Sequence, residues 1–258
     1  MRITWLKTAS LLLENDSFKL AVDPFLGIPY TDAAEKMKAF RSADAVLVTH
    51  GHFDHIYHIP RIYRDHPVPV YCTKTPAASL IKDGYPEDMI HVISPHDVLS
   101  FSGMKITCLP SKHCKFDRDL IVAKLTSLNN AKLAGQMFAL LKLNKAYPEN
   151  EEILLYDIEA DGKRIQLMGS MNLLDEDYPE GADLLILPFQ GRSDIDSFGE
   201  KIIRRLKPKT VLLDHHDDAF PPMSGTVETA SFEELLSSRY GIPCRAMTFL
   251  KTERTEDL

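Results

Sequence analysis

The stretch VTHGHFDH, residues 48–55, gathers side chains that commonly bind metal ions. It contains the imidazoles of His50, His52 and His55 and the carboxylate of Asp54. Imidazoles and carboxylates suit zinc, iron, manganese and nickel. Residues two positions apart point to the same side of an extended segment, so His50 and His52 can serve one ion. Asp54 and His55 lie on the turn that follows and can serve a second ion.

Each ion would still need a ligand from a distant part of the chain. His113 and His215 are the natural candidates, because each ends an apolar run typical of a buried strand, MKITCLPSKH and TVLLDHH. Functional side chains of α/β sheets gather at the carboxyl ends of strands. We therefore expect the imidazoles of His113 and His215 to meet the histidine cluster.

The other candidate ligands carry weaker signals. Cys114 follows His113, but adjacent strand residues face opposite sides, so we expect its thiol to point away. His216 suits either a contact that supports a ligand or ordinary packing. The remaining histidines are interpreted as ordinary helix or loop residues: His58, His66, His91 and His96.

The elements around these residues follow strand and helix patterns in turn. RITWL, SLLLE and ADAVLVTH read as strands, and the last of them delivers the histidine cluster. ILLYDIEADGKRIQLMGS reads as a hairpin, because Asp161-Gly162 suits a two-residue turn. DSFGEKIIRRLKP and SFEELLSSRYG read as helices, and CRAMTFLK as the last strand. This order, which runs twice, predicts two packed sheets with helices outside.

An insertion at about 115–150 interrupts the alternation, and the apolar spacing within residues 118–147 predicts a helical hairpin. Because the insertion follows His113, one interpretation is a lid or pocket wall over the metals. The alternatives are a hairpin that packs on its own domain, or a contact between copies of the chain in a homo-oligomer. Its expected apolar surface consists of Met137, Phe138, Leu140, Leu141 and Leu143.

The composition is that of a globular protein. The chain has 258 residues, of which 44% are hydrophobic and 26% charged, so it can bury a core without disulfides. Because no repeat or linker is visible, we expect residues 1–258 to form a single domain. The net charge of −7 argues against a dedicated nucleic-acid binder, because such proteins usually carry a basic stripe.

The expected compartment is the cytoplasm. The four cysteines are scattered and form no CxxC pair, which is typical of reduced thiols. No signal-sequence pattern is visible at the N-terminus. No stretch approaches the roughly 20 apolar residues of a membrane span, so a membrane partner is not expected.

THGHFDH also matches the HxHxDH motif of the metallo-β-lactamase superfamily. Three further segments resemble the branch that contains L-ascorbate-6-phosphate lactonase and the N-acylphosphatidylethanolamine phospholipase D type hydrolases: MRITWLKTASLLLENDSFKLAVDPFLG, ADLLILPFQGR and LKPKTVLLDHHD. The likeness covers most of the chain except roughly 115–150. It implies an α+β fold, an αββα four-layer sandwich with metals at one edge.

The resemblance also implies a ligand set. Carried over by position, His50, His52 and His113 would bind the first ion, and Asp54, His55 and His215 would bind the second.

This sequence departs from the resemblance at two positions. Thr8 stands where relatives usually have a histidine. Ser170 stands where the bridging carboxylate of the family normally falls. We therefore expect one or two divalent ions, with zinc as the first choice and manganese, iron or nickel as alternatives.

The expected function is that of a metal-dependent hydrolase. A metal ion lowers the pKa of bound water from about 15.7 to about 7, which provides hydroxide near neutral pH. Its target would be a small-molecule carbonyl or phosphoester, as in a lactonase, amidase or phosphodiesterase. Asp54 is the expected catalytic residue, holding or relaying the proton of the water. The alternatives are an iron-dependent oxidoreductase and, because of Ser170, a non-catalytic metal-binding member of the same fold.

Overall fold

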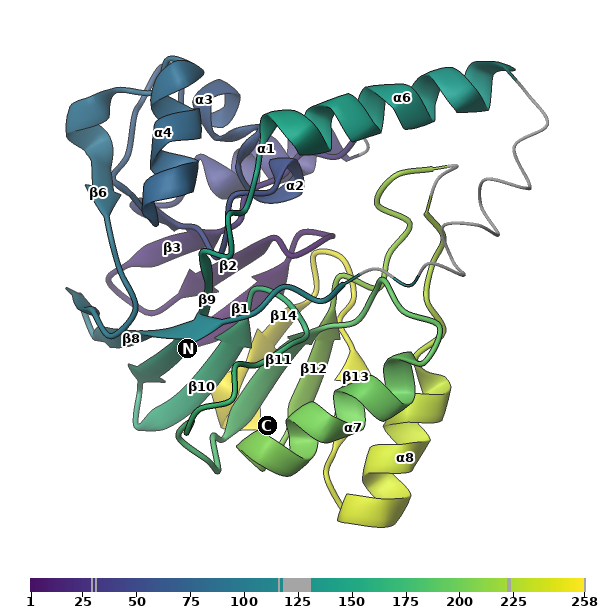
Figure 1. Cartoon of the computed structure of the whole chain (residues 1–258). Helices are drawn as coiled ribbons and strands as arrows, with labels where there is room; N and C mark the ends of the chain where they lie inside the picture. The colour runs from purple at the N-terminus through teal and green to yellow at the C-terminus, as the bar shows by residue number, and fades with distance from the viewer. Residues whose placement is uncertain (29, 31, 116, 118–130, 222–223, 258) are drawn as a thin grey trace.

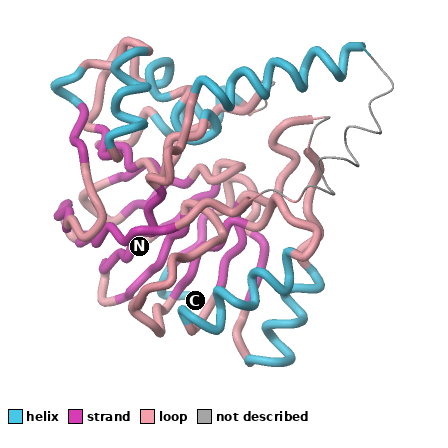
Figure 2. The backbone as a smooth tube through the Cα atoms, viewed as in Figure 1, coloured by secondary structure: helices cyan, strands magenta, loops and turns pink. Residues whose placement is uncertain are grey.

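The computed structural model describes residues 1–28, 30, 32–115, 117, 131–221 and 224–257. Within these residues, two seven-stranded sheets lie face to face, with helices on both outer sides (Figure 1). The strands occupy the middle of the molecule and the helices its periphery (Figure 2). The predicted fold class, an αββα four-layer sandwich, is therefore confirmed. That residues 1–258 form a single domain stays a prediction.

The first sheet comes mainly from the N-terminal part of the chain. Its strands are β1 (Arg2–Trp5), β2 (Leu11–Glu14), β3 (Lys19–Val22), β4 (Ala45–Leu47), β5 (Val70–Cys72), β6 (Ile90–Val92) and β14 (Thr252–Arg254). They are arranged in the order β14-β1-β2-β3-β4-β5-β6. The strands from β14 to β3 are antiparallel, whereas those from β3 to β6 are parallel. The carboxyl end of β4 leads directly into the histidine cluster.

The second sheet delivers the two distant histidines. Its strands are β7 (Val98–Phe101), β8 (Met104–Ser111), β9 (Ile153–Ala160), β10 (Lys163–Met168), β11 (Leu184–Pro188), β12 (Val211–Asp214) and β13 (Cys244–Ala246). They are arranged in the order β13-β12-β11-β10-β9-β8-β7. β7 to β10 are antiparallel, and β10 to β13 are parallel.

Helices cover the outer face of each sheet (Figure 1). Over the first sheet lie α1 (Ala33–Phe40), α2 (Phe53–Ile56), α3 (Ile59–Ile62), α4 (Lys74–Lys82) and α6 (Ala131–Ala146). Over the second sheet lie α7 (Ile195–Leu206) and α8 (Ala230–Tyr240). Two 3₁₀ turns complete the described elements: η1 (Glu87–Met89) and η2 (Thr255–Asp257). Among the described helices, none combines the length and the apolar character that crossing a bilayer requires.

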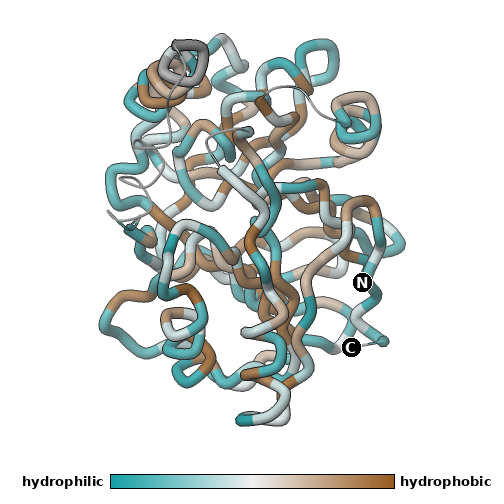
Figure 3. Tube along the Cα trace, turned by 90° about the vertical axis from the view of Figure 1, so that its right-hand side faces the viewer, coloured by the Kyte–Doolittle hydropathy of each residue, from teal (hydrophilic) through white to brown (hydrophobic). Residues whose placement is uncertain are grey.

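Alternating side chains divide the apolar residues among three core layers. In β2, Leu11 and Leu13 point between the sheets, whereas Leu12 packs with the helices over the first sheet. In β12, Leu212 points between the sheets, whereas Leu213 packs with residues of α7 and α8. Because both faces are covered, these strands are continuous apolar runs, and such runs are the reason that the strands could be recognised in the sequence. Hydrophobic stretches run through the interior, and the outer turns are mostly hydrophilic (Figure 3).

The hairpin prediction is confirmed, and the prediction of the last strand is wrong. Asp161 and Gly162 join β9 to β10 with φ values of 50° and 72°, as a tight two-residue turn requires. The segment CRAMTFLK forms only the short β13, Cys244–Ala246. The chain then returns to the first sheet, where β14 pairs antiparallel with β1. A three-residue strand at an edge, far in sequence from its partner, leaves little pattern to recognise.

The insertion is described only in part. α6 forms its second half, and the first arm of the predicted hairpin lies outside the described residues. Leu140 and Leu143 are partly buried and pack against the core over the first sheet. Phe138 and Leu141 are 70% and 60% exposed, so the expected apolar surface is real along one side of α6. Met137 is half-buried.

Candidate metal centre

Strand ends from both sheets meet at one edge of the sandwich. After β4 the chain passes through His50 and His52 in extended conformation, and α2 then carries Asp54 and His55. His113 follows the end of β8, and His215 follows the end of β12. The four side chains of residues 50–55 thus follow a strand of the first sheet, whereas His113 and His215 follow strands of the second sheet.

The structure brings His50, His52 and His113 into one group. One potential ligand atom of each residue lies within 4.8 Å of those of the other two. Nε2 of His50 lies 3.2 Å from Nδ1 of His52. The ring centroid of His113 lies 5.3 Å from that of His50 and 4.6 Å from that of His52. Three ring nitrogens around one point are the ligand set of many catalytic zinc ions.

Asp54, His55 and His215 form a second group beside the first. Their potential ligand atoms also lie within 4.8 Å of one another. Oδ2 of Asp54 lies 3.8 Å from Nε2 of His55 and 3.4 Å from Nε2 of His215. The rings of His50 and His55 are only 3.8 Å apart, so the two groups are direct neighbours. The six residues expected from the sequence therefore lie together, in the two expected groups of three. That they bind metal ions stays a prediction.

Asp23 fixes the orientation of His55, and the sequence reasoning missed it. This fully buried carboxylate accepts the Nδ1–H of His55 at 2.8 Å. It also accepts the backbone N–H of Thr49 at 2.8 Å and its hydroxyl at 2.6 Å. With Nδ1 occupied, His55 turns Nε2 toward Asp54. A carboxylate that holds the second nitrogen of a ligand histidine is a common feature of metal sites. The only signal in the sequence is an aspartate directly after the apolar strand KLAV.

The pKa values of the three histidines in the first group are all lowered, which favours their uncharged form. Burial, reinforced by neighbouring imidazoles, lowers the pKa of His50 well below its ordinary value. Burial also lowers the pKa of His52, and it lowers that of His113 to about 4. Only a deprotonated imidazole nitrogen can bind a metal ion. At neutral pH these three side chains therefore need to lose no proton before they bind an ion.

The second group is held together as an ion-pair cluster. Burial disfavours the charged form of His55, but Asp23 and Asp54 outweigh it and raise its pKa to about 9. Burial likewise opposes the charge of His215, and Asp54 raises its pKa. Burial would raise the pKa of Asp54, yet the two imidazoles hold it well below the usual range. A divalent cation would fit here by taking the place of the imidazole protons.

One buried ring nitrogen that lacks a hydrogen-bond partner within the described ranges is also relevant to whether metal ions fit this site. Nδ1 of His215 is buried and has no hydrogen-bond partner among the described residues. Its other ring nitrogen faces Asp54. A buried imidazole nitrogen without a partner is costly, and an ion or an ordered water is a usual partner for such a group. The donor set and this unpaired atom are both compatible with divalent metal ions.

Ser170 is tied to the backbone beside His113. It is 7% exposed, and its Oγ accepts the N–H of Cys114 at 2.8 Å. Its hydroxyl therefore has a structural role where the family usually has a carboxylate. The side chain of Cys114 is buried in the core between the second sheet and its helices, as expected from the strand alternation.

Glu149 places a carboxylate next to the first group, and no sequence pattern marked it. Its Oε2 lies 3.9 Å from Nδ1 of His113. The same oxygen is buried and has no hydrogen-bond partner among the described residues, and burial raises the pKa of this carboxyl. The loop that carries it is well anchored, because Thr75 donates its N–H and its hydroxyl to Glu152 at 2.7 and 2.8 Å. Asn150 has a φ of 49° within this loop, a conformation that non-glycine residues rarely adopt.

Thr8 and His216 support the site without entering it. Thr8 donates its backbone N–H to Asp217, and its carbonyl accepts the backbone N–H of His215 at 3.0 Å. These contacts use the backbone, so they do not depend on the side chain at this position. His216 stacks on Trp5 at 4.7 Å, and its Nε2 lies 3.1 Å from the carbonyl of Met247. Of the two interpretations of His216, packing fits this position.

A family model and solved structures match this chain. A model described as a beta-lactamase superfamily domain matches residues 19–216. The structure of Igni18, a metallo hydrolase from Ignicoccus hospitalis, has a TM-score of 0.64 at 17% identity and covers 98% of this chain and 97% of its own. An isothiocyanate hydrolase from Delia radicum gut bacteria has a TM-score of 0.62 at 14% identity and covers 98% of both chains. At these identities the likeness shows the fold.

Curated relatives match shorter stretches. A UPF0173 metal-dependent hydrolase from Archaeoglobus fulgidus is 43% identical over 74 residues, which are 28% of this chain and 30% of the relative. Another from Polaromonas sp. is 24% identical over 234 residues, which are 83% of this chain and 76% of the relative. The chain spans less than half of the relatives from Archaeoglobus fulgidus and Pyrobaculum calidifontis, at 30% and 39% of their lengths.

Proposed function

The chain belongs to the beta-lactamase superfamily, and from this membership we propose that it is a metal-dependent hydrolase of a small molecule. One observation carries the proposal: six potential ligands converge as two groups of three, although they come from three distant segments and from both sheets. The names of the relatives from Archaeoglobus fulgidus and Polaromonas support a metal-dependent hydrolase.

His50, His52 and His113 would hold one ion, and Asp54, His55 and His215 would hold the other. Three protein ligands for each ion leave a position for water or substrate, which is the arrangement of catalytic zinc sites. Zinc fits these nitrogen and oxygen donors best, and manganese, iron or nickel are alternatives. When bound, such ions lower the pKa of water and polarise a carbonyl or phosphoryl oxygen.

The side chains of the protein prepare this chemistry. Asp23 holds the Nδ1–H of His55, so Nε2 is the nitrogen that would bind an ion once its proton is displaced. Asp54 stays ionised because His55 and His215 lower its pKa, so it can accept a hydrogen bond from a water molecule and hold that molecule in place. Glu149 adds a carboxylate beside His113.

The proposed substrate is a small molecule with a hydrolysable carbonyl or phosphoester bond. Lactonase, amidase and phosphodiesterase chemistry all fit a metal-activated water, and the isothiocyanate hydrolase with the same fold acts on another small electrophile. The net charge of −7 continues to disfavour nucleic acid as substrate. A cytoplasmic location and a homo-oligomeric state stay predictions.

The proposal is tested by measuring bound metal and hydrolysis together. Wild-type protein and the variants His52→Ala, His113→Ala and His55→Ala are analysed by elemental mass spectrometry after loading with Zn²⁺, and His91→Ala on β6 is the control. A lactone, an anilide and bis(p-nitrophenyl) phosphate are then assayed with the loaded proteins. We expect each of the three ligand variants, but not the control, to bind less zinc than the wild type and to lose all hydrolysis. Full zinc content in His52→Ala and His113→Ala would contradict the proposal.

A further inference from the structure

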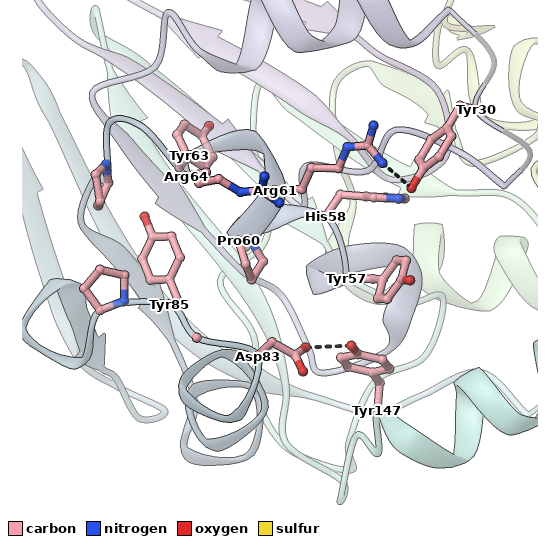
Figure 4. A pocket seen from close by; sticks show the side chains of 13 residues that line it. Tyr30, Tyr57, His58, Pro60, Arg61, Tyr63, Arg64, Asp83, Tyr85 and Tyr147 are labelled. Atoms are coloured by element: carbon pink, nitrogen blue, oxygen red, sulfur yellow. Dashed lines mark hydrogen bonds between the residues drawn. The ribbon is translucent and has the colours of Figure 1, made fainter.

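A cavity of about 490 Å³ lies in the helical layer over the first sheet (Figure 4). It is lined by residues from the segment after α2, from α3, from the end of α4 and from the loop after α6. None of the six candidate metal ligands lines it. Its volume is typical of small-molecule sites, which range from about 300 to about 1,000 Å³. The cavity is therefore large enough for a ligand of its own.

Arg61 is held in place at one side of this cavity. Its guanidinium lies 4.5 Å from the ring centroid of Tyr30 and donates to the hydroxyl of Tyr30 at 2.7 Å. Figure 4 shows this contact as a dashed line between two of the residues that line the cavity. Arg64 lines the same cavity and forms no ion pair with a described residue. Positioned guanidinium groups bind the oxygen pairs of carboxylates and phosphates.

His58 presents a fixed hydrogen-bond donor at the back of the cavity. Its Nδ1 accepts the backbone N–H of Leu26 at 3.1 Å, so the hydrogen of the neutral ring is on Nε2. Burial, with Arg61 and Lys36, lowers the pKa of His58 to about 3, which keeps the ring neutral. The side chain is 1% exposed, and Nε2 has no hydrogen-bond partner in the described part of the chain. Its ring lies 5.3 Å from that of Tyr30, which is 50% exposed.

The remaining lining favours a flat anion. Among the described residues that line the cavity, Asp83 is the one carboxylate, and it already accepts the hydroxyl of Tyr147 at 2.6 Å. These lining residues thus carry two positively charged guanidinium groups and one carboxylate that already accepts a hydrogen bond, so their net charge is positive. The rings of Tyr57 and Tyr147 meet edge to face at 5.6 Å, so they form a rigid aromatic wall. The ring of Pro60 lines the cavity as well.

We propose that this cavity binds a small organic oxyanion, a carboxylate or a phosphate ester carried on a flat ring. Arg61 and Arg64 bind the anionic oxygens, and the Nε2–H of His58 gains the acceptor that it lacks. The tyrosine and proline rings hold the body of the ligand. This assignment goes beyond the proposed hydrolase function, because it uses none of the metal ligands.

The test is calorimetric titration of zinc-loaded protein with four probes. Phenylphosphonate and benzoate carry both an oxyanion and a ring, inorganic phosphate lacks the ring, and benzyl alcohol lacks the charge. We expect at least one of the first two to bind at least tenfold more tightly than the last two. Whichever of the two binds more tightly identifies the oxyanion as phosphate-like or carboxylate. Failure of both to bind at 10 mM, or equal binding of benzyl alcohol, would overturn the proposal.

Three variants locate the binding. Arg61→Gln and Arg64→Gln should each weaken binding about tenfold, whereas Arg239→Gln on α8 should leave it unchanged. His58→Asn keeps an acceptor for Leu26 and removes the Nε2–H, so we expect at least threefold weaker binding at a temperature well below the melting temperature of the variant. If the arginine variants bind as wild type does, the cavity is not the site.

One further variant separates the cavity from the metal centre. The double variant His52→Ala/His113→Ala, which leaves Asp54, His55 and His215 in place, should bind phenylphosphonate or benzoate as wild type does. Loss of probe binding in this variant would place the probe on the metals and overturn the cavity proposal, while the hydrolase proposal would stand. Conversely, a protein that binds no metal but retains probe binding would contradict only the hydrolase proposal.

Discussion

At the scale of single residues, carboxylates lie close to a ring nitrogen of two candidate ligands. Asp23 holds Nδ1 of His55 at 2.8 Å, and Glu149 approaches Nδ1 of His113 to 3.9 Å. Each group of ligands thus has one imidazole with a carboxylate beside it. Such carboxylates orient ligand histidines and make them better donors.

Replacing Glu149 tests whether its carboxylate acts on the metal centre. Loss of such a neighbour typically weakens metal binding by about 10- to 100-fold. We expect Glu149→Gln to lower the zinc affinity of the group that contains His113 by roughly tenfold at pH 7. Competition between the protein and a fluorescent zinc chelator measures this affinity. The matched control is Glu151→Gln, which changes an exposed carboxylate two residues away in the same loop. Equal affinities of the two variants would show that Glu149 is not coupled to His113.

The candidate ligands could be predicted, whereas their supporting residues could not. The spacing of His50 and His52 carries its own geometry, and His113 and His215 each end a recognisable apolar strand. Glu149 stands in the acidic stretch ENEE, where nothing distinguishes it from its neighbours. His58 was interpreted as an ordinary residue, because only the fold reveals that its ring is buried at a cavity.

At the scale of elements, α1 contains a buried charge that the fold has not neutralised. Lys36 is 1% exposed, and its ammonium forms no hydrogen bond to a described residue. Burial lowers its pKa from 10.5 to about 8, although Asp217 acts in the opposite direction. The amphipathic pattern of α1 is therefore broken at one position, which is one reason that this helix was not recognised in the sequence.

Removing this charge should stabilise the protein at neutral pH. At about 1.4 kcal/mol for each pH unit between the two pKa values, burial of the ammonium costs roughly 3 kcal/mol at pH 7. Between pH 8 and pH 10.5 the unfolded chain holds the proton more tightly, so the stability of the wild type rises with pH in this window. We expect Lys36→Met to be more stable at pH 7 by up to roughly 3 kcal/mol and to lack this rise.

Urea unfolding at pH 7, 8.5 and 10 measures both effects. The control is Lys38→Met, which removes an exposed ammonium from the same helix. It should keep the pH dependence of the wild type. A Lys36→Met variant whose stability rises with pH as steeply as that of the control would rule out Lys36 as the source.

At the scale of the whole molecule, the metal centre joins the two sheets. Four ligands follow β4 of the first sheet, and His113 and His215 follow β8 and β12 of the second. The pairing of β14 with β1 also joins segments from opposite ends of the chain, and the sequence did not predict it. Both features depend on segments that are distant in the chain, whereas the strands themselves follow from short local apolar runs.

Removing metal should therefore destabilise the fold as a whole. An ion present at 100 times its dissociation constant adds about 2.7 kcal/mol to the free energy of unfolding. We expect EDTA to lower the melting temperature of zinc-loaded wild type by several degrees, as measured by scanning calorimetry. The variant His52→Ala/His113→Ala should respond less, because one of its ions is already lost. An unchanged wild-type melting temperature after verified zinc removal would contradict this role of the metals.

Tyr57 and His58 leave α2 directly after Asp54 and His55, so one short piece of backbone borders both the metal centre and the cavity. A displacement of this backbone segment would move residues of the metal centre and residues of the cavity together. Thermodynamic reciprocity then governs them: an ion at Asp54 and His55 must change the affinity for an oxyanion by the same factor as the oxyanion changes the affinity for the ion.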